Sequence, residues 1–311
     1  MKTMKSKAIR PGDTIGLAMP ASPVKMETLQ KAISTLENLG FHIQFARRFN
    51  KNNKNFLAGS INSRVEELHT LFVDPEVDGI LCLRGGYGTP ALLPYLDYSL
   101  IARHAKLLIG YSDITALHIA LQQKSKMITL HGPMAASDLI DAPSFTTQHF
   151  LHSLTAERWP QRLMNPPRFP IKTLVHGTAS GILTGGNLTV IAGLMGTPFE
   201  IDTRGKVLFL EDVDEEPYQI DRALTQLSLA GKLDDAAAFI LGTCEDCTST
   251  AYPNGDNVIT VCERILAPYG KPTVYNLQAG HGDHQLTLPL GARAQVNATG
   301  KHIDILEKVV I

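Results

Sequence analysis

The chain has 311 residues, of which 44% are hydrophobic and 19% are charged, and its formal net charge is -1. This composition supplies enough apolar side chains for about two folded domains and excludes an intrinsically disordered chain. The sequence has no basic run and no stretch of about 18 apolar residues. We therefore expect neither a nucleic-acid partner nor a segment that spans a membrane.

The N-terminus has some features of a secretory signal, because four lysine or arginine residues precede the apolar segment 14–19. However, residues 11–13 interrupt this pattern, and the apolar segment ends at Pro20, which makes it too short for the core of a signal peptide. We therefore expect a cytoplasmic protein whose first element is a strand at 14–19.

The first half of the chain alternates short apolar strands with amphipathic helices. Met26, Leu29 and Ile33 recur at spacings of three and four, which predicts a helix that Gly40 ends. Thr89 and Pro90 fit the N-cap and the first position of another helix. Such alternation predicts a parallel sheet covered by helices on both faces. The predicted strands are 14–19, 42–46, 79–83 and 106–109, and the other helices pass through 65–72 and 114–123.

A proline-rich stretch divides the chain, because four prolines fall between residues 160 and 170. Proline disfavours both helices and inner strands, so we predict a linker at 156–172 between an N-terminal α/β domain, 1–155, and a C-terminal domain, 173–311. The C-terminal domain is predicted to be β-rich. Its predicted strands are 173–183, 207–210, 238–241, 285–288 and 303–306, and its predicted helices are 188–195, 219–229 and 258–266.

A serine lies in the tight turn Gly110–Asp113, between an apolar strand and an amphipathic helix. Ser112 at this corner would expose its hydroxyl above the sheet edge, beside helix N–H groups that suit a developing oxyanion. The alternative is that Ser112 only caps the helix, since serine is a preferred cap residue. Ile114 stands where the Gly-x-Ser-x-Gly nucleophile motif has its last glycine.

The glycine-rich loop Arg84–Gly88 also follows a predicted strand. Its glycines allow the backbone to approach a ligand closely, and open α/β sheets bind ligands at the carboxyl ends of strands. The loop suits one wall of an oxyanion hole, although an ordinary strand-to-helix turn has the same composition. Its glycine spacing does not match the phosphate-binding motifs.

Two segments of the second half carry groups suited to acid–base chemistry. Glu211 follows an apolar strand and begins an acidic stretch, and its carboxylate suits the orientation of a histidine. A cation site and a solvated acidic loop are the alternatives. His281, between Gly280 and Gly282, suits a general base. His284 lies nearby, but a third metal ligand is missing, so we expect no metal.

The four cysteines include a Cys-x-x-Cys pair, Cys244 and Cys247. This spacing occurs in redox pairs and in half-sites for zinc, but Cys262 alone does not complete a zinc site. We expect reduced and partly buried thiols.

Serine, glutamate and histidine follow one another in the order found in α/β-hydrolases. The sequence further resembles the LD-carboxypeptidase family of serine peptidases, which includes the microcin C self-immunity peptidases. The matching segments occur in the family's order and extend over nearly the whole chain. They are Pro11–Gly16, Leu57–Gly59, Arg84–Gly88, Gly110–Thr115, Gly185–Leu188, Leu210–Val213, Gly280–Gly282 and Leu286–Pro289.

The resemblance implies a flavodoxin-like, parallel-sheet N-terminal domain and a smaller β-rich C-terminal domain. It implies a nucleophile at Ser112, a base at His281 and an orienting carboxylate at Glu211. It also implies an oxyanion hole formed by the backbone N–H groups of Gly86 and Asp113. The stretch 214–216 is more acidic than the resemblance leads us to expect, which leaves Asp212 as an alternative partner for the histidine.

The family's typical reaction removes the terminal D-alanine from a muropeptide tetrapeptide in cell-wall recycling. The resemblance therefore implies a small peptide substrate, no cofactor, a cytoplasmic location and a homodimer. We expect Arg84 or Arg222 to bind the terminal carboxylate of the substrate.

Three alternatives stay open at the level of sequence. One is a peptidase of the microcin-immunity type that acts on an aminoacyl nucleotide. Another is a non-catalytic protein that binds a small ligand. The third is a metal-dependent hydrolase that uses Glu211, Asp212 and His281.

Overall fold

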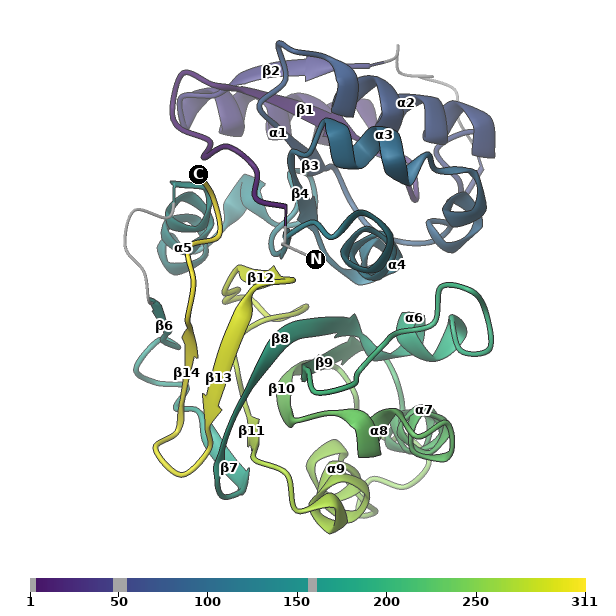
Figure 1. Cartoon of the computed structure of the whole chain (residues 1–311), viewed down its shortest axis with the longest axis vertical. Coiled ribbons are helices and arrows are strands. Elements are labelled where there is room, and N and C mark those ends of the chain that lie inside the picture. The colour runs from purple at the N-terminus through teal and green to yellow at the C-terminus, as the bar shows by residue number, and fades with distance from the viewer. Residues whose placement is uncertain (1–3, 47–54, 156–160) are drawn as a thin grey trace. The chain divides into compact units, whose positions relative to one another are not determined.

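A computed structural model describes residues 4–46, 55–155 and 161–311, and the chain divides into two compact units (Figure 1). The N-terminal unit comprises Met1–Glu157, Thr287–Pro289 and Val309–Ile311. The C-terminal unit comprises Arg158–Leu286 and Leu290–Lys308. Of the linker predicted at 156–172, residues 156–160 lie outside the described ranges, and 161–172 belong to the C-terminal unit.

The N-terminal unit is built on a six-stranded sheet whose order is β12-β5-β4-β3-β1-β2. The pairs β1·β2, β1·β3, β3·β4 and β4·β5 are parallel, as predicted. Every residue of β3 and β4 is buried, which explains why their sequences are apolar throughout rather than alternating. The strands are β1 (Thr14–Ala18), β2 (His42–Phe45), β3 (Gly79–Cys82), β4 (Leu107–Gly110), β5 (Thr129–His131) and β12 (Leu288–Leu290).

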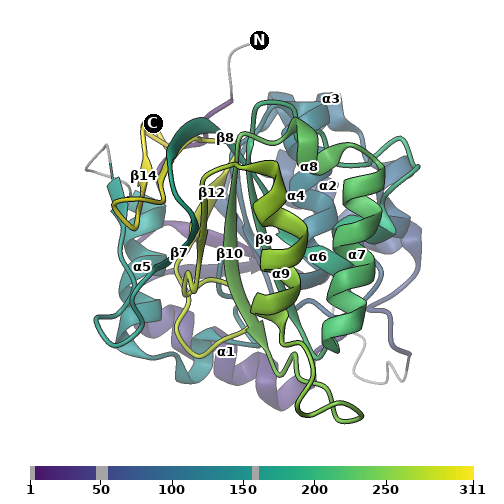
Figure 2. The ribbon, with the colours of Figure 1, turned by 90° about the horizontal axis from the view of Figure 1, so that it is seen from below.

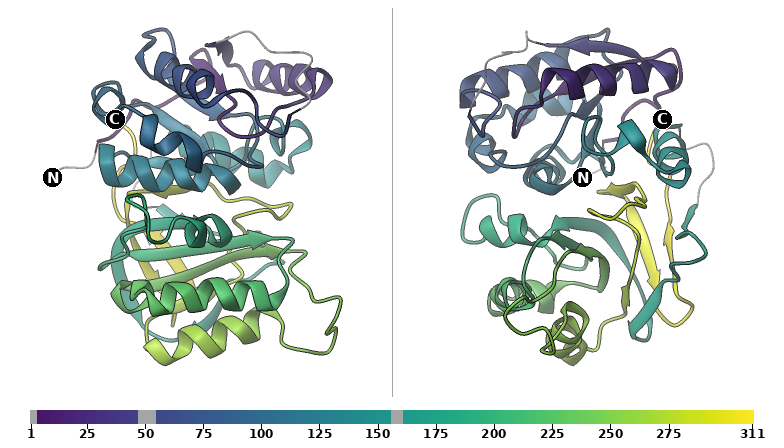
Figure 3. Two further views of the ribbon diagram at one scale, coloured as in Figure 1. Left: turned by 90° about the vertical axis from the view of Figure 1, so that its right-hand side faces the viewer. Right: turned by 180° about the vertical axis from the view of Figure 1, so that it is seen from behind.

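Helices cover this sheet, with α3 on the side seen in Figure 1 and α1 across the side seen from behind in Figure 3. Helix α1 buries Leu29, Ala32 and Leu36, one face of the predicted amphipathic pattern. The helices are α1 (Met26–Asn38), α2 (Ile61–Val73), α3 (Tyr98–Arg103), α4 (Thr115–Ala120) and α5 (Ser144–Thr155).

Two local predictions for this unit hold in position but differ in the type of helix. Thr89 is the N-cap and Pro90 the first residue of a helix, as predicted, but that helix, Pro90–Tyr95, is a 3₁₀ helix, and the Thr89 hydroxyl donates to the Asp113 carbonyl instead of capping it. The helix predicted at 114–123 is shorter, since a 3₁₀ turn, Ser112–Ile114, precedes α4 and a π-helical turn, Leu121–Ser125, follows it.

The C-terminal unit contains an eight-stranded mixed sheet whose order is β6-β14-β13-β8-β9-β10-β11-β7. Strands β8, β9, β10 and β11 are parallel, and the flanking strands run antiparallel to their neighbours. The strands are β6 (Gln161–Leu163), β7 (Lys172–Val175), β8 (Thr178–Asn187), β9 (Val207–Val213), β10 (Ala238–Glu245), β11 (Thr273–Tyr275), β13 (Arg293–Asn297) and β14 (His302–Ile305).

Two strand predictions for the second half needed correction. The segment 173–183 holds two strands, β7 and β8, because the chain turns at Gly177, whose φ is 131°. The strand predicted at 285–288 begins only at Leu288 and is β12, which pairs in the sheet of the N-terminal unit.

Helices α7 and α9 lie side by side over β9 and β10 in Figure 2. The acidic stretch before α7 forms its N-terminus, because the backbone N–H of Glu216 donates to Gln219 Oε1 at 2.7 Å in a capping box. Within the described ranges, no helix combines the length and the apolar surface that crossing a bilayer requires. The helices of this unit are α6 (Leu188–Gly193), α7 (Pro217–Leu229), α8 (Lys232–Asp235) and α9 (Val258–Leu266).

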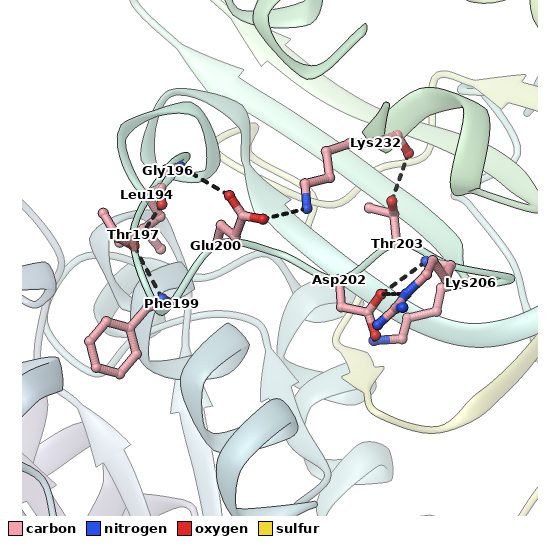
Figure 4. Close-up of polar contacts among 10 residues, drawn as sticks. Leu194, Gly196, Thr197, Phe199, Glu200, Asp202, Thr203, Lys206 and Lys232 are labelled. Atoms are coloured by element: carbon pink, nitrogen blue, oxygen red, sulfur yellow. Dashed lines mark hydrogen bonds and ion pairs between the residues drawn. The ribbon is translucent and has the colours of Figure 1, made fainter. Parts of the chain in front are cut away.

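The connection that leads from α6 into β9 is fixed by polar contacts (Figure 4). The Glu200 carboxylate accepts from the backbone N–H of Gly196 at 3.0 Å and pairs with Lys232 Nζ at 2.9 Å. Thr203 Oγ1 donates to the carbonyl of Lys232 at 2.7 Å. These contacts hold the chain just before the strand that carries Glu211.

Candidate active site

Ser112 lies on a strained turn directly after β4. Its φ is 62°, a value that residues other than glycine rarely adopt, and it begins the 3₁₀ turn Ser112–Ile114. Such a turn projects a nucleophile from the carboxyl end of a strand. A Cβ on Gly110 would lie 3.0 Å from Ile114 Cγ1. The backbone of residue 110 therefore approaches Ile114 so closely that glycine is needed at position 110, two residues before the serine. Ile114 itself occupies the position where the nucleophile motif has its second glycine.

The backbone of the Arg84–Gly88 loop lies directly against this serine. A Cβ on Gly85 would lie 2.9 Å from Ser112 Cβ and 3.0 Å from its Oγ. Gly86 has a φ of 105°, and a Cβ there would lie 2.3 Å from Ser22 Oγ, which accepts from the backbone N–H of Tyr87. Glycine at position 85 thus lets the loop approach the Ser112 hydroxyl, and glycine at position 86 lets the loop pack against Ser22.

The loop and the serine turn are joined through Asp113. The backbone N–H of Thr89 donates to Asp113 Oδ2 at 2.8 Å, and the Thr89 hydroxyl donates to the Asp113 carbonyl. Burial raises the pKa of the Asp113 carboxyl, while the bonds from Thr89 oppose that shift. The two N–H groups predicted as oxyanion donors, those of Gly86 and Asp113, therefore belong to segments that are held together.

Two buried charged residues on α2 support the loops after β1 and β3. Arg64 Nη1 donates to the carbonyls of Pro20, at 2.6 Å, and Gly88, at 3.0 Å. Glu67 Oε2 accepts from the backbone N–H of Met19 at 3.0 Å. Hydrogen bonds to charged groups are about twice as strong as neutral ones, which suits them to fixing irregular backbone.

In the C-terminal unit, His281 and Glu211 form a hydrogen-bonded pair. His281 Nδ1 lies 2.7 Å from Glu211 Oε2, and the Glu211 side chain is fully buried near the end of β9. A carboxylate accepts, so Nδ1 carries the proton and Nε2 keeps a lone pair. Burial raises the pKa of Glu211, and its bond to His281 opposes the shift. This arrangement presents Nε2 as a base.

Glycine also permits this close pairing. Gly280 has a φ of 121°, and a Cβ there would lie 2.6 Å from both Glu211 Oε2 and Thr243 Oγ1. Thr243 binds both sides of the histidine, because its Oγ1 donates to the Ala279 carbonyl at 3.2 Å and accepts from the Gly282 N–H at 3.3 Å. The loop 279–282 is therefore attached to β10.

Asp212, the alternative carboxylate, faces a different set of partners. Its Oδ1 accepts from Asn187 Nδ2 at 2.8 Å, and its Oδ2 accepts from the N–H and the hydroxyl of Thr189, both at 2.9 Å. These residues form the start of α6. Asp212 therefore holds that helix to β9, whereas Glu211 contacts the imidazole.

Comparison with known proteins places this geometry in a family. The profile of the LD-carboxypeptidase N-terminal domain matches residues 15–132, and that of the LD-carboxypeptidase C-terminal domain matches residues 180–296. The probable murein peptide carboxypeptidase of Bacillus subtilis is 40% identical over 305 residues, 96% of this chain and 92% of that protein. The chain belongs to the LD-carboxypeptidase family.

Two further relatives cover nearly all of the chain. The crystal structure of muramoyltetrapeptide carboxypeptidase from Oxalobacter formigenes has a TM-score of 0.83 and 31% identity, and covers 94% of this chain and 99% of that one. The microcin C7 self-immunity protein MccF of Escherichia coli is 27% identical over 328 residues, 96% of this chain and 94% of that protein. The mixed α/β fold and the recognition of a serine carboxypeptidase family from sequence motifs are thereby confirmed.

The arginines predicted to bind substrate in this LD-carboxypeptidase family member are both exposed. Arg84 follows β3 in the N-terminal unit, and Arg222 lies on α7 in the C-terminal unit. Both remain predictions.

No sequence motif indicated Arg64 or Thr243, which support this LD-carboxypeptidase site, and Thr89 was predicted only as a helix N-cap. One signal was available for Arg64, because it lies four residues before the buried Leu68, on the apolar side of α2. A charged residue at such a position is buried only with partners.

The metal-dependent alternative requires a suitable donor set. Among the residues that the structure describes, no group of three His, Cys, Asp or Glu side chains is arranged to hold a metal ion. Asp212, one of the three predicted ligands, directs its oxygens to Asn187 and Thr189.

Proposed function

We propose that this protein is a serine carboxypeptidase that removes the terminal D-alanine from murein tetrapeptides, with Ser112, Glu211 and His281 as its triad. The observation that carries the proposal is the 2.7 Å bond between His281 Nδ1 and the buried Glu211, which leaves Nε2 available as a base. Two relatives named for murein-peptide hydrolysis, at 40% and 31% identity, support the choice of substrate.

In the proposed reaction, His281 Nε2 takes the proton of the Ser112 hydroxyl as its oxygen attacks the peptide carbonyl. The histidine then gives that proton to the leaving D-alanine amine, and an acyl-enzyme forms. Water activated by the same nitrogen hydrolyses the ester. The N–H groups of Gly86 and Asp113 bind the oxyanion, and losing one such donor costs about 3 kcal/mol.

Glu211 stabilises the imidazolium that forms during each proton transfer. Its side chain is fully buried, so its charge interacts with the ring through a medium of low dielectric constant. The same bond fixes the ring orientation and its tautomer.

A carboxypeptidase must also bind the free carboxylate of its substrate. We propose that Arg84 or Arg222 supplies this charge, because both residues are exposed. Arg84 follows β3, the neighbour of the strand that precedes Ser112, and Arg222 lies on α7, the helix that follows the strand of Glu211. Arg84→Met and Arg222→Met are measured separately. Only the variant that lacks the carboxylate-binding arginine should show a raised KM for the tetrapeptide.

We further propose a cytoplasmic homodimer. Four free cysteines, two of them in a Cys-x-x-Cys pair, suit a reducing compartment. Analytical ultracentrifugation of the purified chain tests the dimer, and fractionation of the native cell tests the compartment.

The decisive experiment measures D-alanine release from a murein tetrapeptide by the wild type and by Ser112→Ala. We expect steady turnover by the wild type in the presence of EDTA and none by the variant. A matched peptide ending in L-alanine tests the configuration. Turnover by a well-folded Ser112→Ala, or no release from the tetrapeptide by the wild type, would overturn the proposal.

The 27% identity to MccF over 96% of the chain favours a second substrate for the same triad. An aminoacyl sulfamoyl adenylate offered in parallel with the tetrapeptide separates the two. A larger kcat/KM for the nucleotide conjugate would assign the protein to the self-immunity activity instead.

A further inference from the structure

Three thiols that the proposed reaction does not use lie around one cavity of the C-terminal unit. Cys244, Cys247 and Cys262 all line a cavity of about 640 Å³ near the carboxyl end of β10 and the start of α9. All three are free cysteines. The three thiols therefore belong to one small-molecule-sized cavity.

Cys244 and Cys247 are brought together by a tight turn at the end of β10. Asp246, between them, has a φ of 53°, and the backbone N–H of Thr248 donates to the Asp246 carbonyl at 2.9 Å. The hydrogen bond from Cys244, together with one from the backbone N–H of Glu215, lowers the pKa of the Cys247 thiol. The bond between the two thiols and burial raise the pKa of Cys244.

The other two cysteines lack this pairing. Burial raises the pKa of Cys262 to about 12. Cys82 lies within β3 with no exposed surface, and burial raises its pKa far above the usual range. Since the thiolate is the reactive form, we expect attack at the Cys244–Cys247 pair, which lines the cavity, rather than at Cys262 or Cys82. Cys247, whose pKa is lowered, is written below as the attacking sulfur.

The turn that carries these thiols is attached to the loop that carries His281. Thr243 immediately precedes Cys244, and its N–H donates to the Ala279 carbonyl at 3.0 Å. Its hydroxyl bonds to Ala279 and Gly282, on the two sides of the histidine. Thr243 thus bonds the residue before Cys244 to the backbone on both sides of His281.

The same turn also contacts the N-terminus of α7. Ser249 Oγ donates to Glu216 Oε2 at 3.0 Å, and the backbone N–H of Asp214 donates to the Glu245 carbonyl at 3.0 Å. These contacts join the turn to the segment that directly follows β9, the strand of Glu211.

We propose that Cys244 and Cys247 are a reactive dithiol that low-molecular-weight disulfides oxidise to an intramolecular disulfide, and that this bond slows the peptidase by displacing the His281 loop. The first half is independent of the peptidase activity. The second half rests on the proposed function.

The chemistry is two thiol–disulfide exchanges. The Cys247 thiolate attacks one sulfur of a small disulfide, forming a mixed disulfide and releasing one thiolate, which takes up a proton. The Cys244 thiol, on losing its proton, then attacks the Cys247 sulfur and releases the second small thiol. Two protein thiols are oxidised, and one small disulfide is reduced to two thiols.

The first test is chemical and uses glutathione disulfide as the probe. After exposure, alkylation and denaturation, an endoproteinase that cleaves at Glu245 or Asp246 cuts between the two cysteines. We expect the two fragments to stay joined until a reductant is added. Cys262→Ala, which alters the third thiol of the same cavity, should behave identically, whereas Cys247→Ser should yield separate fragments. Separate fragments from the wild type, or a bond that needs Cys262, would overturn the dithiol.

The second test measures murein tetrapeptide hydrolysis before and after oxidation. We expect about a tenfold loss of kcat in the wild type and in Cys262→Ala, since small displacements of a catalytic group have effects of this size or larger. Dithiothreitol should restore the rate, and Cys247→Ser should keep its rate throughout. A disulfide-bonded protein with unchanged kcat would refute the regulatory half. A fully reduced protein without peptidase activity would instead refute the proposed function and leave the thiol mapping valid.

Discussion

The two units hold their reactive groups by different means. In the N-terminal unit, the position of Ser112 depends on backbone: a φ of 62°, glycines that admit a neighbouring loop, and buried side chains such as Arg64 that bind carbonyls. In the C-terminal unit, the His281 side chain bonds to the buried Glu211 carboxylate, and Thr243 attaches the histidine's loop to β10. We therefore expect Ser112 to be sensitive to backbone changes alone, whereas His281 should also be sensitive to the removal of a buried charge.

The largest expected effect tests whether these two groups form one catalytic unit. Ser112→Ala should lower kcat by about six orders of magnitude, because residual rates in serine peptidases come from the oxyanion hole and binding alone. His281→Ala should lower it similarly. The double variant should be no slower than either single variant, since removing one member disables the other. The measurement is single-turnover hydrolysis of the tetrapeptide.

The outcome that contradicts a shared catalytic step is a double variant whose loss of activation free energy equals the sum of the two single losses. Such a result would show that the serine and the imidazole act independently, and the assignment of His281 as base to Ser112 would fail.

Removing the negative charge of Glu211, the partner of His281, should cause the next largest loss of kcat. Glu211→Gln keeps the side-chain shape but not the charge, and we expect kcat to fall by about four orders of magnitude, as for triad carboxylates elsewhere. The adjacent Asp212→Asn provides the matched control. It should leave kcat near the wild-type value and lower stability by about 1–3 kcal/mol, because Asp212 holds the start of α6.

Kinetics and urea unfolding of the two variants separate these roles. A larger loss of kcat in Asp212→Asn than in Glu211→Gln would transfer the orienting role to Asp212.

Much of the fold could be predicted from local pattern, and the exceptions have physical reasons. The apolar helix face of α1 and the buried strands β3 and β4 follow directly from residue spacing. Strand β5 has only three residues, Thr129–His131, which is too short for a periodic signal. Strand β12 contains Pro289 and pairs with residues far away in the chain, so its partner depends on tertiary contacts.

Sequence motifs indicate candidate reactive groups for this site but not the residues that support them. Ser112, Glu211 and His281 have side-chain chemistry that a motif can reveal. The contributions of Thr89 and Thr243 depend on which backbone groups lie opposite them in space. A threonine has many possible partners, so its sequence position alone does not identify one.

A glycine substitution tests how closely the base is packed. Gly280→Ala would place a Cβ 2.6 Å from Glu211 Oε2 at a φ of 121°, so the His281–Glu211 bond must move. We expect about a hundredfold loss of kcat, the usual effect of misplacing a reactive group by an ångström. Gly196→Ala is the matched control, because Gly196 also has a positive φ but nothing lies within 4 Å of an added Cβ.

Both variants place alanine at a positive φ, 78° at position 196 and the more strained 121° at position 280, and only Gly280→Ala also carries the steric conflict at the base. Equal rates for the two would show that the conflict is relieved without moving the imidazole.

The smallest expected effect concerns the backbone just before the nucleophile. His118 is buried, with Nε2 2.8 Å from the Gly110 carbonyl, and burial lowers its pKa from 6.5 to about 4. The unfolded chain therefore binds a proton that the folded chain does not between these values, and stability is lost as the pH falls. Between neutral pH and about pH 5.5, His118 should lower the free energy of unfolding by about 1 kcal/mol.

Urea unfolding of the wild type and of His118→Gln at both pH values measures this difference, since glutamine can still donate to the Gly110 carbonyl and does not titrate. An identical loss in both proteins would mean that His118 is already protonated in the folded state, and the neutral histidine behind the serine turn would be excluded.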